Sequence, residues 1–202
     1  MPRPDAVVFD IGNVLITWDP EREYDARFGE AERKRLFAEV DLHGMNERVD
    51  AGANFRDSVF ALAENHPEDR EMIEAWYHHW LDMASPAIDD SWVLLRRLRK
   101  AGVPVFALSN FGIQTYALAQ TVYPILHEFD RPYISGHMGV TKPGPDIYRM
   151  VEEDSGLTGA QLFFIDDRAD NIAAAEARGW QGHVFHAPAA LEQALEATGL
   201  RF

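Results

Sequence analysis

Short apolar segments recur along the chain with helical patterns between them, and this alternation constrains the fold most strongly. The apolar segments are residues 6–9, 103–108, 132–135, 162–165 and 183–185. Each is apolar at consecutive positions and rich in Val, Ile and Phe, which is typical of strands that are buried on both faces of a parallel sheet. Apolar residues at helical spacing lie between them, at residues 92–100, 147–153, 170–178 and 189–197. Strands that alternate with helices predict an α/β protein with a doubly wound, Rossmann-like parallel sheet.

Residues 20–85 break this alternation. They contain helical patterns at 31–40, 55–64 and 70–83 and no convincing strand pattern. Turns between helices are expected at the helix-breaking residues of this interval, Gly29, Gly44, Gly52 and Pro67. We therefore predict a discontinuous core domain, residues 1–17 and 86–202, with a helical cap domain, residues 18–85, inserted after the first strand.

Bulk composition limits the function classes that fit. The 202 residues are 47% hydrophobic, enough for one core and a smaller appended unit. With 33 acidic and 19 basic residues the formal net charge is −14, so we expect no nucleic-acid partner, and a phosphate site needs local positive charge. The absence of cysteine excludes disulfides, thiolate metal sites and a cysteine nucleophile. Apolar stretches are too short for a signal peptide or a membrane span, which predicts a cytoplasmic protein with no membrane partner.

Polar residues follow several of the apolar segments, where doubly wound sheets bind their ligands. Asp10 follows the first segment, Ser109 and Asn110 the second, and Asp166 and Asp167 the fourth; Lys142 lies in the loop after the third. A carboxylate can attack phosphorus, hydroxyl and amide groups can bind phosphoryl oxygens, and a lysine can neutralise them.

The acidic pair Asp166 and Asp167 indicates a cation site. Together with Asp10, these carboxylates would raise one another's pKa unless a cation joined them. Mg²⁺ favours a few carboxylates together with water and phosphate oxygens. A magnesium ion would also hold a phosphate near Asp10 and offset the repulsion between the two anions.

Four segments, VVFDIGNVL, ALSNF, TKPGPDIY and FFIDDRADN, occur in an order that resembles the haloacid dehalogenase (HAD) superfamily. The resemblance spans nearly the whole chain, and the helical insert resembles the cap of subfamily I. It implies that Asp10 is a catalytic nucleophile, that Ser109 and Asn110 bind the transferring phosphoryl group, and that Lys142 steadies this group.

The resemblance also implies a set of metal ligands. Asp10 and Asp167 would bind Mg²⁺ directly and Asp166 through water, while the backbone carbonyl of Gly12 would complete the protein's share of the coordination. Asn171 would support the acidic loop. The implied activity is a Mg²⁺-dependent phosphatase that hydrolyses a small phosphorylated metabolite through an aspartyl-phosphate intermediate.

Gly12 departs from the pattern of most phosphatases in this superfamily, which carry a second Asp there as general acid and base. General acid–base assistance is typically worth about 10²- to 10⁴-fold, so its absence slows the reaction without abolishing it. As a hypothesis, Asp19 or a metal-polarised water replaces it. Glycine at this position also resembles a group close to the bacterial α-D-glucose-1-phosphate phosphatases, which makes a sugar phosphate the leading substrate class.

Several alternatives remain open. Each motif alone could be an ordinary turn or helix cap. Trp18 could touch the substrate or pack the joint between the domains, and the aromatic residues 76–80 could line an entrance or form the core of the cap. Rival functions are a metal-independent 2-haloacid dehalogenase and a weakly catalytic binding or regulatory protein of the same fold. A monomer and a homodimer are both compatible with the sequence.

Overall fold

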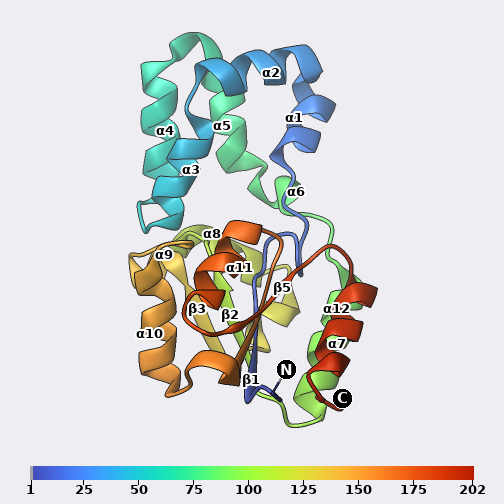
Figure 1. The fold of residues 1–202 in the computed structure, drawn as a ribbon. Coiled ribbons are helices and arrows are strands. Elements are labelled where there is room, and N and C mark those ends of the chain that lie inside the picture. The colour runs from blue at the N-terminus through green and yellow to red at the C-terminus, as the bar shows by residue number, and fades with distance from the viewer. Residues whose placement is uncertain (1) are drawn as a thin grey trace.

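The computed structural model describes residues 2–202 and contains a five-stranded parallel sheet with helices on both faces (Figure 1). The strands, listed by position in the chain, are β1 (Ala6–Phe9), β2 (Val105–Ser109), β3 (Arg131–Ile134), β4 (Leu162–Asp166) and β5 (Gln181–Val184). Their spatial order is β3-β2-β1-β4-β5. The direction of winding reverses at β1, so its carboxyl end lies at the switch point where such sheets bind ligands. The predicted α/β fold is confirmed.

Alternate residues of β1 enter two separate hydrophobic cores, one on each face of the sheet. Val7 and Phe9 belong to the core that includes residues of α7 (Asp89–Lys100), α8 (Ile113–Gln120) and α12 (Pro188–Ala197). Ala6 and Val8 belong to the core formed with α10 (Pro145–Ser155) and α11 (Ala169–Glu176). The period of two along a strand explains this division, and burial on both faces explains the unbroken apolar segments.

Local signals set the ends of the helices that flank the sheet. Helix α7 begins with Asp89 and Asp90 and ends with basic residues, which complements the helix dipole. Helix α10 has Pro145 in its first turn and ends before Gly156, whose φ of 72° favours glycine. The single-turn helix α9 (Ser135–Met138) and the 3₁₀ turns η2 (Pro124–His127) and η3 (Gly159–Gln161) occupy connections between strands and helices.

A helical unit follows β1 and lies over the carboxyl edge of the sheet (Figure 1). Its elements are α1 (Pro20–Phe28), α2 (Glu30–Glu39), α3 (Leu42–Asp50), α4 (Phe55–Asn65), η1 (Pro67–Asp69), α5 (Arg70–His78) and α6 (Trp80–Met83). Trp76 and Tyr24 are fully buried in it. The arrangement is compatible with the proposed cap at 18–85, and these domain boundaries stay a prediction.

Some sequence predictions about the helical unit were wrong. The helix predicted over 70–83 is two helices, because the chain leaves helical geometry at His79. Gly44 lies inside α3 and not in a turn: Asp41 caps this helix through the N–H of Gly44, and a Cβ there would come 2.3 Å from the capping oxygen. Helices α1, α3 and α8 were not predicted. Within residues 2–202, no helix is long and apolar enough to cross a membrane.

Candidate active site

Asp10 lies directly after β1, and a buried lysine holds its side chain. The Asp10 carboxylate is 10% exposed, and its Oδ1 lies 3.0 Å from Lys142 Nζ and accepts a hydrogen bond from the Ile11 N–H at 2.7 Å. Burial raises the pKa of Asp10 above its usual value, Lys142 opposes this shift, and Asp166 adds to it. The free carboxylate is therefore costly at this position unless positive charge compensates it.

Lys142 reaches the site from the loop before α10 and is completely buried. Its Nζ donates to Asp166 Oδ2 at 2.6 Å and to the carbonyl of Leu108 at 2.9 Å. Burial lowers the pKa of Lys142, but the charges of Asp10 and Asp166 outweigh this effect, so its net pKa is raised. A buried ammonium group thus lies between two of the predicted acids.

Asp10, Asp166 and Asp167 each offer an oxygen, and these oxygens lie within 4.8 Å of one another. Both oxygens of Asp166 already accept hydrogen bonds within the protein, from Lys142, Asn171 and the Arg168 N–H. Asp167 accepts one, at 3.0 Å, from the side chain of Asn13. Burial raises the pKa of Asp167, and the neighbouring Asp166 adds to the shift. A Mg²⁺ site requires oxygen ligands and excess negative charge. The three aspartates supply both, and Asp167 has oxygen atoms left to bind a cation.

Ser109 and Asn110 follow β2 at the same edge of the sheet. Ser109 is buried, and its side chain beside Asp10 lowers the pKa of this carboxyl group, against the effect of burial. The Asn110 side chain forms two hydrogen bonds with the backbone of Lys142: its Nδ2 donates to the carbonyl at 2.9 Å, and its Oδ1 accepts from the N–H at 2.8 Å. The Asn110 side chain therefore positions the loop that carries the buried ammonium group.

The sequence reasoning did not single out Asn13. Its φ of 53° lies in the left-handed region, which asparagine tolerates better than most residues. Its amide donates to Asp167, and its Oδ1 accepts from the Trp18 N–H at 2.9 Å. Asn13 thus ties the loop after β1 to the acidic loop after β4. The FDIGN segment carried a usable signal, since an Asn after Gly in a tight turn often adopts this conformation.

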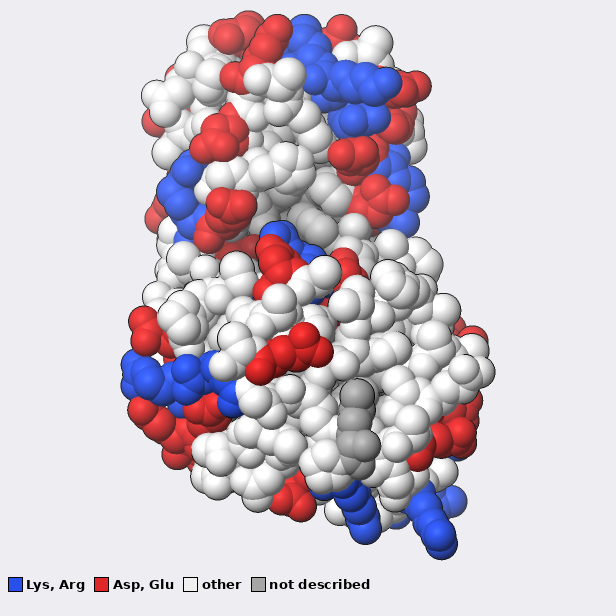
Figure 2. All heavy atoms as spheres, viewed as in Figure 1, with Lys and Arg blue, Asp and Glu red and all other residues white. Residues whose placement is uncertain are grey.

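These side chains share a cavity of about 610 Å³ between the sheet and the helical unit. Figure 2 shows charged side chains at the waist of the molecule, where the two parts meet. The predicted residues that line the cavity are Asp10, Gly12, Trp18, Ser109, Asn110, Lys142, Asp167 and Asn171. Asp166 lies behind them, fully buried against Lys142. A more open hollow of about 760 Å³, which includes Arg96 and Arg131, contains none of these residues.

The opposite wall of this cavity includes four polar residues of α3. His43, Asn46, Glu47 and Asp50 recur at helical spacing, and we call them the polar face of α3. The sequence reasoning missed them, although their spacing was readable, because α3 itself was not predicted. Trp18 also lines the cavity and packs against Trp80, with ring centroids 5.6 Å apart.

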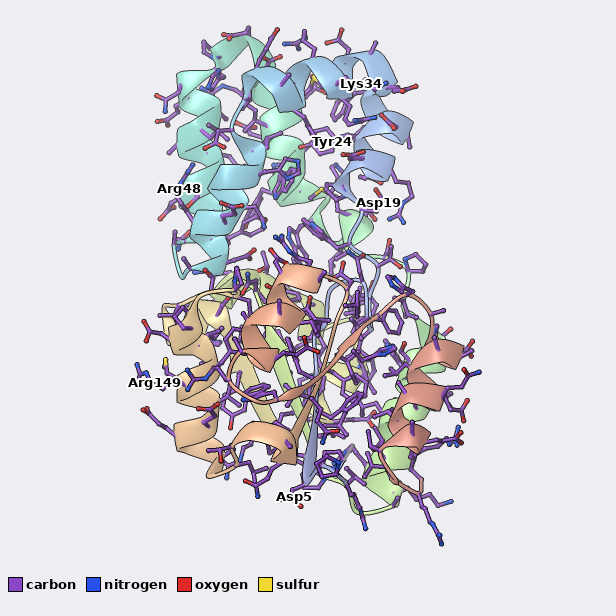
Figure 3. The ribbon with its side chains drawn as sticks, viewed as in Figure 1. Asp5, Asp19, Tyr24, Lys34, Arg48 and Arg149 are labelled. Atoms are coloured by element: carbon purple, nitrogen blue, oxygen red, sulfur yellow. The ribbon has the colours of Figure 1, made fainter. Side chains whose placement is uncertain are left out.

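Within residues 2–202, Asp19 does not line this cavity, although its neighbour Trp18 does. The Asp19 side chain caps α1 by accepting from the Arg22 N–H at 2.9 Å. In Figure 3 it lies where the helical unit joins the rest of the chain. Its proposed role as a proton relay finds no support in this position.

The comparisons with known proteins agree on one family. A model described as haloacid dehalogenase-like hydrolase matches residues 4–179. The chain is 24% identical over 187 residues to D-ribitol-5-phosphate phosphatase of Bacteroides thetaiotaomicron, covering 87% of this chain and 88% of that protein. It is 24% identical over 194 residues to sesquiterpene phosphatase astK of Aspergillus oryzae, covering 88% and 87%. It spans only 34% of drimenol cyclase drtB of Aspergillus calidoustus, at 23% identity.

Solved structures show the same relationship. A HAD family enzyme of Bacteroides thetaiotaomicron, in complex with magnesium and inorganic phosphate, matches with a TM-score of 0.71 and 26% identity, over 91% of this chain and 95% of that one. L-2-haloacid dehalogenase of Xanthobacter autotrophicus shares the fold, with a TM-score of 0.61 and 24% identity over 89% of this chain and 76% of that one. Because the family model spans most of the sequence, the chain belongs to the haloacid dehalogenase-like hydrolases.

Proposed function

We propose that the protein is a Mg²⁺-dependent phosphatase that forms a phosphoryl intermediate on Asp10. The observation that carries this proposal is the convergence of Asp10, Asp166 and Asp167 around the buried Lys142 ammonium group. An Asp10 oxygen attacks phosphorus, and the bond from phosphorus to the alcohol oxygen breaks. Water then attacks the same phosphorus and releases phosphate and free Asp10.

The chain's own groups orient this reaction. Lys142 neutralises one phosphoryl oxygen or the nucleophile, and Ser109 donates to another. Asn110 supports Lys142, and Asn171 supports Asp166. Mg²⁺, held by Asp10, Asp167 and the Gly12 carbonyl, with Asp166 acting through water, would supply the positive charge that lets two anions approach. A structure of a relative in complex with magnesium and inorganic phosphate supports the use of this cation with a phosphate substrate.

The polar face of α3 favours a hydroxylated leaving group. Asn46 is already bonded to Asp50 and Trp76, but two other members, His43 and Glu47, line the cavity with nitrogen and oxygen atoms that can form hydrogen bonds. An apolar leaving group would cover these atoms without hydrogen bonds, at a cost of about 1–3 kcal/mol each. A sugar or polyol phosphate is therefore the proposed substrate class. The D-ribitol-5-phosphate phosphatase relative supports it, and Gly12 supports the narrower likeness to the α-D-glucose-1-phosphate phosphatase group.

The rival functions fit the site less well. A 2-haloacid dehalogenase attacks carbon and needs no cation, which leaves the acidic cluster without a purpose. A binding or regulatory protein has no need for a nucleophile held 3.0 Å from a buried lysine. Absence of nucleic-acid and membrane partners, a cytoplasmic location and a monomeric or homodimeric state remain predictions from sequence.

The test is a screen of phosphorylated metabolites with Mg²⁺, with p-nitrophenyl phosphate as the generic substrate. We expect phosphate release that disappears in excess EDTA, returns with added Mg²⁺, and is lost in Asp10→Asn. Turnover that persists in EDTA, or an Asp10→Asn variant as active as the parent, would refute the proposal.

A further inference from the structure

The site has a nucleophile and a compensating charge, but position 12 in the loop after β1 has no side chain that could donate a proton to the departing alcohol. Gly12 stands beside the nucleophile, and a Cβ built there would meet nothing within 4 Å. Its φ is not in the left-handed region, so the backbone does not demand glycine. The cavity next to Asp10 is therefore open, and a group from elsewhere in the chain has room to act there.

Asp50 is the last residue of α3 and reaches this cavity from the helical unit. Asn46, one turn earlier, donates to Asp50 Oδ2 at 3.0 Å and orients the carboxyl group. The Asp50 carbonyl accepts from the buried hydroxyl of Ser135 at 2.6 Å, which ties the end of α3 to the core. A Cβ on Gly52 would come 2.9 Å from the Gly136 carbonyl, so the chain after Asp50 lies directly against α9. The position of Asp50 is thus set by contacts with the core.

The environment of Asp50 suits proton exchange near neutral pH. Burial raises the pKa of Asp50 to about 7, and the charges of Asp10 and Glu47 add to the shift. The Gly112 N–H and Lys142 oppose it. Asp167, Arg168 and His43 are the other titratable or charged groups that line this cavity. A carboxyl group in this condition can both donate and accept a proton in one catalytic cycle.

We propose that Asp50 is the general acid and base of this enzyme, in place of the carboxylate that Gly12 lacks. In the first step the Asp50 proton passes to the leaving oxygen as its bond to phosphorus breaks and the Asp10–phosphorus bond forms. In the second step the Asp50 carboxylate takes a proton from water, whose oxygen bonds to phosphorus as the bond to Asp10 breaks. This inference rests on the proposed phosphatase function.

The test compares leaving groups that differ in their need for a proton. In Asp50→Asn, we expect kcat/KM for alkyl phosphates such as ribitol 5-phosphate to fall by about 10²- to 10⁴-fold. With p-nitrophenyl phosphate, whose leaving group needs no proton, the first turnover should stay near the parent rate. Later turnovers should slow, because water attack has lost its base, and nitrophenolate should appear as a burst. In the parent, kcat/KM for alkyl phosphates should decline above pH 7 as Asp50 loses its proton, and in Asp50→Asn this decline should disappear.

Matched variants separate this role from its rivals. Asp19→Asn removes the other carboxyl group considered as a proton relay and keeps a residue that caps helices well. Asp57→Asn changes an exposed carboxylate of α4 outside the cavity. Both variants should keep the parent rate. Adding Gly12→Asp to Asp50→Asn should restore part of the alkyl phosphate activity. Two results would overturn the inference. One is a folded Asp50→Asn variant that loses first-turnover rate equally on alkyl and nitrophenyl phosphates. The other is a double variant without recovered activity, although the single variant Gly12→Asp is active. An active Asp10→Asn would instead refute the phosphatase proposal itself.

Discussion

Replacing Lys142 by methionine tests how much of the site's electrostatic cost a single buried ammonium group offsets. Methionine has nearly the same length, so the substitution removes charge and hydrogen bonds without leaving a large cavity. Three contacts of Nζ are lost, with Asp166 Oδ2 at 2.6 Å, the Leu108 carbonyl at 2.9 Å and Asp10 Oδ1 at 3.0 Å. Both carboxylates then remain buried near each other without their cation.

Removing one partner of a buried ion pair costs about 3–5 kcal/mol, and we expect a loss of this size in the free energy of unfolding at pH 8 without metal. Two conditions should shrink it. At pH 5 protonation of Asp10 relieves the repulsion, because the pKa of this carboxyl, already raised by burial, rises further without Lys142. A divalent cation should also reduce the loss, because it replaces the missing positive charge and therefore binds the variant more tightly than the parent, and tighter binding stabilises the folded state more.

Urea unfolding followed by tryptophan fluorescence measures these differences. The matched control is Lys34→Met, because Lys34 is 63% exposed and pairs with Glu30 on the surface (Figure 3). Such pairs contribute about 0–1 kcal/mol, so this variant should stay close to the parent. A loss in Lys142→Met below about 1 kcal/mol at pH 8, unchanged at pH 5 and by Mg²⁺, would refute the electrostatic account of the site.

Three further predictions concern the polar face of α3 and its support. Gly52→Ala should lower alkyl phosphate turnover more than Gly29→Ala. Both glycines have a positive φ, but only a Cβ on Gly52 would approach backbone of the core, the Gly136 carbonyl. Equal effects of the two variants in steady-state assays would count against this contact. The raised pKa of Asp50 makes the parent lose stability as pH rises from about 4 to 7, and Asp50→Asn lacks this loss. The free energy of unfolding of the variant, relative to the parent, should therefore be roughly 1–3 kcal/mol more favourable at pH 8 than at pH 5. The same difference between variant and parent urea midpoints at both pH values would contradict this. His43→Leu should raise KM for polyol phosphates and leave p-nitrophenyl phosphate less affected, because His43 lines the cavity; a uniform change in kcat/KM would argue against sugar recognition.

The sheet and the acids at its edge were predictable because each has a local cause. A strand buried on both faces must be apolar at consecutive positions, and β1 and β4 are. The carboxyl ends of parallel strands meet at one edge, so Asp10 and Asp167 had to approach each other once the strands paired. Strand limits were less certain: β2 begins at Val105, not at 103, since Pro104 has no N–H to donate.

The helical unit was less predictable, because its helices have weaker patterns. Helix α1 is mostly charged, and Tyr24 and Pro20 are its buried residues. In α3 a glycine looked like a turn, although it is where a capping carboxylate approaches the backbone. Without α3, the helical spacing of His43, Asn46 and Asp50 carried no meaning.

The sequence alone determined the chemistry that the core can offer, because the nucleophile, the lysine and the acidic pair belong to strand ends and loops whose meeting point follows from parallel pairing. Only the tertiary structure decided what covers this chemistry. Asp50 and Asp10 lie forty positions apart in a mostly helical stretch of chain, and no periodicity states which face of a helix turns toward a sheet. Packing around Trp76 and the contact between Ser135 and Asp50 made that choice.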